Sequence, residues 1–419
     1  MLATLKKAWS VPELRRKIIM TLLLLLVYRL GSFIPVPYID SQQLSSLVSG
    51  NNFFGLFNII SGGNFENFTI FAMGITPYIN AEIIMNLLVF AIPALESLQK
   101  EGEEGRKKIA QYTRYLTIVL AVIQALGMTL SYRQLLVERT FFTIFTVILI
   151  VTAGTVLLMY IGDKITEIGI GNGISLIIFI SIVSRIPSAI QNIYQYMQVG
   201  TMNIVTLILL IIFIVVATVA VVAVTEGQRK IPIQYAKRVV GRKMYGGQNT
   251  HIPLRVNMAG VIPIIFASSL TLLPATLGHF FPNSGFTQWL AKYFAWGTPL
   301  TTILYVVLTV AFTYFYTAVT FNPYDIADNI KKQGGYVPGI RPGKPTVEYF
   351  TKVMNRLTLF GGIFLAIIAV IPIIVGHFIT GVNMQFGGTS LLIVVGVALE
   401  TVKQLESQLT MRNYQGFLK

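Results

Sequence analysis

Side chains that could do acid–base, nucleophilic or metal chemistry are few in this sequence and lie far apart. The chain has no cysteine and three histidines, and His251, His279 and His377 are scattered over separate segments. It contains no H-E-x-x-H pair, no Walker loop and no plausible pair of nucleophile and base. The sequence therefore predicts no enzyme activity, no cofactor and no metal site.

The composition is that of a membrane protein. Of 419 residues, 54% are apolar and only 12% are charged, whereas a water-covered surface needs about a quarter of residues charged. Apolar stretches of roughly 20 residues, enough to cross a bilayer as a helix, recur ten times. They lie near residues 18–34, 69–92, 115–132, 141–161, 173–192, 204–225, 256–278, 299–320, 357–379 and 388–405.

Basic residues gather on one side of these spans. Lys and Arg number 32 against 17 Asp and Glu, which gives a net charge of +15. If alternate connections lie on alternate sides, all basic residues share one side except Arg29, Arg133, Arg139, Arg185 and Lys292. By the positive-inside rule, the sequence predicts a multi-pass protein with both termini in the cytoplasm.

A helix start precedes the first span. Ser10 is expected to cap it, with Pro12 in the first turn and Glu13 closing a capping box. We expect this helix to begin at the membrane surface and lead into the first span.

Two sequence motifs recur five spans apart. G-I-T-P at Gly74–Pro77 matches G-V-I-P at Gly260–Pro263, and G-I-S-L-I-I at Gly173–Ile178 matches G-T-S-L-L-I at Gly388–Ile393. A repeat of five spans must insert with opposite orientation, and inverted repeats build a pathway at their interface. The sequence predicts two halves, residues 1–195 and 196–419, each with five spans.

The repeat aligns four isoleucines. Ile79, Ile178, Ile265 and Ile393 each lie five residues beyond the first glycine of their motif. On the second and fifth spans these positions share a helix face with polar groups, as in the stripes Ile75, Ile79, Glu82, Asn86 and Ile178, Ile182, Arg185. The isoleucines form either a narrow apolar collar in a wet pathway or ordinary contacts between packed helices, and spacing alone leaves both open.

The connection between the first two spans is also apolar. Residues 53–68 are interrupted by Gly55, Gly62 and Gly63 and are too short to cross the membrane. Such a segment either lies flat in the interface or re-enters the protein to line a cavity, where it would act as a plug.

Two basic loops, 226–255 and 322–350, are longer than a connection between spans requires. Both carry β-type runs, Gly and Pro turns, and aromatic residues. We expect them to contact a partner with an anionic surface, whether lipid, RNA or an acidic protein face.

Several longer motifs together cover essentially the whole chain. Among them are G-S-F-I-P-V-P, G-I-T-P-Y-I-N-A-E-I-I-M-N-L-L, Y-A-K-R-V-V-G-R-K-M-Y-G-G, N-M-A-G-V-I-P-I-I-F-A-S-S and N-P-Y-D-I-A-D-N-I-K-K-Q-G-G-Y-V-P-G-I-R-P-G-K-P-T. In these motifs the chain resembles the SecY family, the central subunit of the bacterial protein-conducting channel. The resemblance implies an all-α membrane protein with ten transmembrane helices in two inverted halves around a central pore.

The resemblance also implies functional residues. A pore ring falls on Ile75, Ile79, Ile178, Ile182, Ile265 and Ile393. A plug falls on residues 53–68, including Phe57, Ile59, Ile60, Ser61, Gly62 and Gly63. A lateral gate, in which spans two and three face spans seven and eight, includes Asn86, Ser268, Ser269 and Thr271. A docking surface for a motor or ribosome includes Lys237, Arg238, Arg242, Lys243 and Arg341.

The implied function is passage of unfolded secretory polypeptides across the bacterial cytoplasmic membrane and lateral release of membrane segments. The implied partners are the SecE and SecG subunits, the SecA ATPase, the ribosome with its nascent chain, signal peptides and anionic lipids. One departure is Asn80-Ala81-Glu82, where the family pattern suggests small, less polar residues. We expect Glu82 to face water.

The alternative is an ion-coupled secondary transporter, since inverted repeats also build carriers. Coupling needs ionisable groups within the spans, and only Arg29, Glu82, Arg185 and Glu400 qualify. The long basic loops would have no role in such a carrier. We therefore predict a passive channel driven by a partner.

Overall fold

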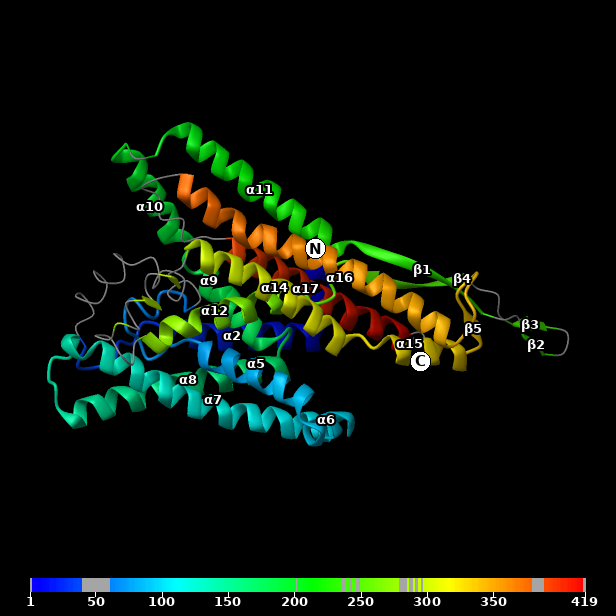
Figure 1. Cartoon of the computed structure of the whole chain (residues 1–419), viewed down its shortest axis with the longest axis horizontal. Helices are drawn as coiled ribbons and strands as arrows, with labels where there is room; N and C mark the ends of the chain where they lie inside the picture. Colours follow the sequence, from blue (N-terminus) through cyan, green and yellow to red (C-terminus); the bar gives the residue numbers. More distant parts are fainter. Residues whose placement is uncertain are drawn as a thin grey trace.

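A computed structural model describes residues 2–39, 61–200, 202–235, 238–240, 243–245, 249–278, 285, 289–290, 293–294, 297–378 and 388–416 (Figure 1). Helices dominate it. They are α1 (Leu2–Ser10), α2 (Pro12–Gly31), α5 (Thr76–Ala91), α6 (Pro93–Lys100), α7 (Glu103–Ser131), the short η1 (Arg133–Leu135), α8 (Phe141–Ile168), α9 (Gly173–Val183), α10 (Ile186–Gln198), α11 (Ile204–Glu226), α12 (Ile262–Gly278), α14 (Pro299–Thr320), α15 (Pro323–Lys332), α16 (Lys344–Phe378) and α17 (Gly388–Gly416).

Each of the ten predicted spans contains a helix, and the multi-pass helical architecture is confirmed. Among the described residues, six helices are long and apolar enough to cross a bilayer. Helix α5 passes the same test only together with α6, which bends away from it by 98°, and α12 is shorter. One of the six, Gly173–Gln198, consists of two helices in succession, because α9 ends at Val183 and α10 begins at Ile186.

The transmembrane helices close into a ring. Contacts run from α5 through α7, α8, α9, α17, α16, α14 and α12 and back to α5, while α2 packs on α8 and α9 and α11 packs on α17. Helices of the two predicted halves therefore meet at two seams, α9 with α17 and α5 with α12. The largest cluster of buried apolar side chains draws residues from all of these ring helices except α7.

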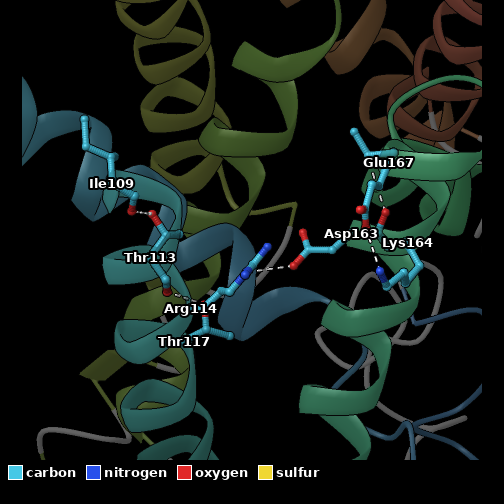
Figure 2. A network of polar contacts seen from close by, with 9 residues as sticks. Ile109, Thr113, Arg114, Thr117, Asp163, Lys164 and Glu167 are labelled. Carbon is cyan, nitrogen blue, oxygen red and sulfur yellow. Dashed lines mark hydrogen bonds and ion pairs between the residues drawn. The ribbon is translucent and has the colours of Figure 1, made fainter. Parts of the chain in front are cut away.

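An ion pair links α7 and α8 in the first half. Arg114 of α7 donates from Nε to an Asp163 oxygen of α8 at 2.8 Å (Figure 2). Thr113 and Thr117 beside it donate to carbonyls of their own helix. The ion pair thus joins the two helices across one interface, with Arg114 half-exposed, where such pairs contribute modestly.

The two long loops form one small sheet. Its strands are β1 (Gln228–Tyr235), β4 (Asn249–Arg255) and β5 (Gly335–Tyr336), in the order β4-β1-β5, and β2 (Arg238–Val240) pairs with β3 (Lys243–Tyr245). Buried Ile231, Ile233 and Leu254 of the first loop pack against Ile330 and Phe350 from the second. This sheet, α6 and α15 lie at one end of the bundle and α10 at the other (Figure 1).

Residues 322–350 are less β-like than the sequence suggested. Only Gly335 and Tyr336 are in a strand, and most of the rest belongs to α15 and the start of α16. Asn322 caps α15 by accepting a hydrogen bond from the Tyr324 backbone, and Pro323 occupies its first turn. These two residues explain why a helix begins there.

The prediction that Ser10 caps the first span is wrong. Helix α1 extends through Ser10, whose hydroxyl donates to the Lys7 carbonyl. The residue at the N-cap of α2 is Val11, which makes no side-chain cap, although Pro12 and Glu13 lie in the first turn as expected. Ser10 cannot cap the next helix because it is already part of the preceding one.

Candidate functional site

An apolar constriction lies at the centre of the helix ring. Four helices, α5, α9, α12 and α17, each contribute one isoleucine to a cavity of about 10 Å³, roughly the space that one water molecule needs. The cavity is lined by Thr76, Ile79, Ile178, Ile265, Ser268, Ser269, Leu272 and Ile393. The isoleucines that the repeat aligned are therefore brought together in space.

All six isoleucines assigned to the ring are buried in the same cluster. Their exposed fractions run from 2% to 8%, and the most exposed is Ile265. Ile75 and Ile182 do not line the cavity itself and pack beside its lining residues. A cavity this small and mostly apolar has no room for a continuous column of water.

The repeated motifs fold alike. Gly74 and Gly260 both adopt positive φ, +56° and +65°, a backbone conformation that a side chain would strain. Helices α5 and α12 begin two residues later, at Thr76 and Ile262. Because each helix starts at the same distance from its glycine, the isoleucine five residues beyond the glycine reaches the same level in both.

The second pair of motifs behaves in the same way. Helix α9 begins at Gly173 and α17 at Gly388, so Ile178 and Ile393 each lie five residues inside their helix. Asn172 caps α9 by accepting from the Ser175 backbone. The helix starts thus set the height of all four isoleucines.

The α5–α12 seam carries one buried hydrogen bond between side chains. Ser269 of α12 donates from Oγ to Oδ1 of Asn80 on α5 at 2.6 Å. Ser268 and Thr271, also assigned to the gate, donate instead to the Ile265 and Ala267 carbonyls of their own helix. Among the hydrogen bonds described for Ser268, Ser269 and Thr271, the one from Ser269 crosses the seam.

Asn80 makes a contact across the α5–α12 seam that the sequence interpretation did not assign. Asn86 was chosen, yet it lies only half-buried in the last third of α5, whereas Asn80 is 5% exposed. A usable signal was present, because an amide in the interior of an apolar helix must find a partner on a neighbouring helix.

The segment assigned to the plug is described in part. Phe57, Ile59 and Ile60 lie outside the described residues, while Ser61 and Gly62 are buried and Gly63 is half-buried. Gly62 packs so closely on α9 that an added Cβ would lie 2.9 Å from the Ser181 Cα.

The described residues assigned to docking, Arg238, Lys243 and Arg341, lie at the end of the bundle that carries the sheet. Arg341 is exposed on an ordered turn between Gly339 and Gly343, both at positive φ. Val337 and Ile340 beside it pack into the cluster under the sheet. Arg238 and Lys243 belong to β2 and β3, and Lys237 and Arg242 lie outside the described residues.

The ionisable side chains in the spans do not form a site that could bind a coupling ion in the described part of the chain. Arg185 pairs with Glu66 at 3.0 Å, and Arg29 stacks over the ring of Phe33. Glu82 is partly buried and has no ion pair within the described part of the chain. Among the described residues, no group of His, Cys, Asp and Glu could hold a metal ion.

A closed ring of membrane helices around a narrow apolar constriction defines the class of a membrane channel. The SecY family profile matches residues 69–402, and the chain belongs to the SecY family. It is 48% identical over 432 residues to "Protein translocase subunit SecY" of Bacillus subtilis and 46% identical over 446 residues to that of Streptomyces galbus, with full coverage of both chains in each case. It is therefore a protein translocation channel.

Solved structures share the fold. One described as "The structure of a protein conducting channel" has a TM-score of 0.67 at 21% identity, over 94% of this chain and 92% of that one. "Sec61 in the Canine ribosome-channel complex from the endoplasmic reticulum" has a TM-score of 0.63 at 20% identity, with the same coverage. The interpretation as a secondary transporter is set aside.

Proposed function

We propose that this chain is the passive, protein-conducting pore of a bacterial cytoplasmic membrane. Unfolded secretory polypeptides would pass through the isoleucine collar, defined as Ile79, Ile178, Ile265 and Ile393. The observation that carries the proposal is the convergence of these side chains, one from each of four helices, on a cavity of about 10 Å³.

The chemistry of the collar suits a seal that must also open. Apolar side chains in a narrow space exclude water, so a hydrated ion meets a barrier without any charged filter. Isoleucine side chains can move apart around an extended polypeptide and close behind it. No bond is made or broken, so the chain needs no catalytic group of its own.

Membrane segments of the polypeptide would leave the channel laterally, into the lipid, through the seam at which α5 and α7 meet α12. The described polar contact that crosses this seam is the bond between Asn80 and Ser269. A signal peptide that inserts between α5 and α12 would replace apolar contacts with its own and would have to break this bond. The seam is therefore the proposed lateral gate.

We expect Ser269→Ala to loosen the gate. It leaves the buried Asn80 Oδ1 without its donor, which costs about 1–3 kcal/mol of closed-state stability. Precursors with weakened signal sequences should then be transported several-fold faster, as measured by protease protection in vesicles. The control is Thr155→Val on α8, which removes a buried hydroxyl that donates to the Val151 carbonyl of its own helix and lies outside the gate and the collar. Equal behaviour of the two variants would contradict a gating role for the Asn80–Ser269 bond.

The driving force would come from partners at the end that carries the sheet. The basic loops, on which Arg341 is exposed, would bind the SecA motor or the ribosome through their positive charge. The same charge would also bind anionic lipids at the membrane surface. One structural relative is described in a ribosome–channel complex, which supports ribosome binding here. SecE and SecG are the expected small membrane subunits, and both termini are placed in the cytoplasm from the charge distribution.

Reconstitution tests the proposal. The chain, purified with its small membrane subunits, is placed in vesicles with a SecA-type motor, ATP and a secretory precursor. We expect the precursor to become protected from external protease only when motor and ATP are present. Absence of protection, in vesicles whose channel is inserted in the correct orientation, would contradict the proposed function.

A further inference from the structure

Glu82 is an acidic residue within a helix whose other side chains are uncharged. Helix α5 has the sequence T-P-Y-I-N-A-E-I-I-M-N-L-L-V-F-A, which contains no second charged residue. An ionisable group within a membrane span is costly, and by default it marks a substrate path with a partner of opposite charge. The surroundings of Glu82 therefore indicate what it could bind.

Glu82 faces away from the lipid. The exposed stripe of α5 consists of Ile84, Leu87 and Leu88, whose exposed fractions lie between 37% and 43%. Residues two positions apart point to nearly opposite sides of a helix, so Glu82 points away from the side of Ile84. Ile79 of the collar lies three residues before Glu82 and is buried on the inner side of α5. The carboxylate, itself half-buried, therefore belongs to the inner side of the helix.

The carboxylate lies on the sheet side of the collar. Helix α5 runs from the collar toward the end of the bundle that carries the sheet, where α6 follows it (Figure 1). Three residues of helix rise by about 4.5 Å, so Glu82 lies almost one turn beyond Ile79. A polypeptide that enters from the sheet side would reach Glu82 before it reaches the collar.

Side chains of three helices share the space beside Glu82. Tyr316 of α14 lies within electrostatic range of both Glu82 and Glu400, a residue of α17. Glu400 follows Ile393 by seven residues, which is two turns along the same helix face. In the ring, α12 lies between α5 and α14, and α16 lies between α14 and α17. Residues on these three helices therefore approach one another across the interior of the ring, and Glu82 is directed into it.

The negative charge of Glu82 has no counterpart on the described part of the chain. None of the ion pairs there includes Glu82 or Glu400. Lys403, three residues after Glu400, pairs instead with Glu226 of α11 at 2.9 Å. A half-buried carboxylate without a cation bears part of its desolvation cost uncompensated, and a lysine or arginine brought to it would offset that cost.

We propose that Glu82 is a specificity-determining residue, which favours polypeptides whose apolar targeting segment is preceded by lysine or arginine. Signal peptides have this order, with a positively charged region before an apolar one. Glu82 would hold the cation on the sheet side of the collar while the apolar residues that follow enter the α5–α12 seam. Asn80, whose bond to Ser269 crosses that seam, lies two residues from Glu82. The proposal rests on the proposed function, because it concerns the polypeptide that the channel transports.

Matched precursors test the proposal. They share one apolar targeting segment and differ before it, where one carries two lysines and the other two glutamines. Initial transport rates are measured with the reconstituted channel complex, and the lysine rate is divided by the glutamine rate. In Glu82→Gln this ratio should fall about three- to tenfold, as expected for loss of one partly buried charge contact. Motor and lipid are the same in all vesicles, so their own preference for cations cancels in the comparison.

A charge reversal extends the test. Glu82→Lys should lower the ratio further than Glu82→Gln, and it should transport a precursor with two glutamates before the segment faster than the unaltered channel does. The control is Glu138→Gln, which removes an exposed carboxylate from the connection between α7 and α8 and should keep the ratio of the unaltered channel. A merely structural role of Glu82 would slow all precursors alike. The same ratio in Glu82→Gln and in the unaltered channel would overturn the proposal.

Crosslinking locates the contact independently. Asn86→Cys places a thiol one turn further along the side of Glu82 in a chain that otherwise has none, and Leu87→Cys places it on the exposed stripe. A precursor with one cysteine beside its lysines should form a disulfide with position 86 and none with position 87. Equal crosslinking at the two positions would contradict the proposed placement of the cations. Transport of the glutamine precursor by the unaltered channel reports on the proposed function separately.

Discussion

Replacing Ile178 and Ile265 by serine is expected to make the resting channel leak ions. The two residues come from helices of opposite halves and line the same cavity of about 10 Å³. Hydroxyl groups would hold water there, and a wet constriction loses its barrier to ions. Resting conductance should rise on the order of tenfold or more, which corresponds to a barrier lowered by only about 1.4 kcal/mol.

The control for this prediction is a pair of isoleucines that face away from the ring. Ile208 and Ile211 of α11 are 52% and 53% exposed, and their replacement by serine should leave conductance unchanged. Conductance is recorded from the channel complex in planar bilayers without a substrate. An ion-tight Ile178→Ser, Ile265→Ser channel would show that these residues merely pack helices together.

Reversing the charge of Arg341 is expected to abolish most motor-driven transport. The residue is exposed on a turn held by the hydrogen bond from the Thr346 hydroxyl to its carbonyl and by burial of Val337. A guanidinium fixed in this way can make a bidentate contact with a partner carboxylate. Arg341→Glu should slow precursor transport on the order of tenfold or more, because it removes that contact and adds repulsion.

A milder change separates geometry from charge. Arg341→Lys keeps the charge but loses the bidentate contact, and should slow transport about threefold or more. Arg106→Glu serves as control, since it makes the same reversal at an exposed position on α7. Closed-state conductance should stay normal in all three variants. Transport at the unaltered rate by Arg341→Glu would show that this turn is not the docking element.

The sequence predicted those features well that depend on residues close together in the chain, such as the positions of the helices. Runs of apolar residues located a helix in each predicted span, and the repeated glycines aligned Ile79, Ile178, Ile265 and Ile393, which the structure gathers around one cavity. This worked because α5 and α12 each begin two residues after a glycine at positive φ, while α9 and α17 each begin at the first glycine of their motif. Helical geometry then fixes the height of the isoleucine five positions beyond that glycine.

Contacts between distant segments could not be predicted in this way. The bond between Asn80 and Ser269 joins residues 189 positions apart, and that between Tyr28 and Ser181 joins residues 153 apart. Such pairs leave no periodic pattern, since each residue alone is only a polar group in an apolar stretch. The error at residues 322–350 was avoidable, because Asn322 followed by Pro323 is typical of a helix start.

Crosslinking to a trapped polypeptide tests the central claim most directly. The chain contains no cysteine, so a cysteine placed at Ile178 is its sole thiol. A precursor with one cysteine is halted midway by a folded domain at its end, and disulfide formation is then induced. We expect the crosslink from position 178 and from position 265, and none from position 208 on the outer face of α11. Crosslinks that are absent at 178 and 265, or as strong at 208, would contradict passage of polypeptides through the isoleucine collar.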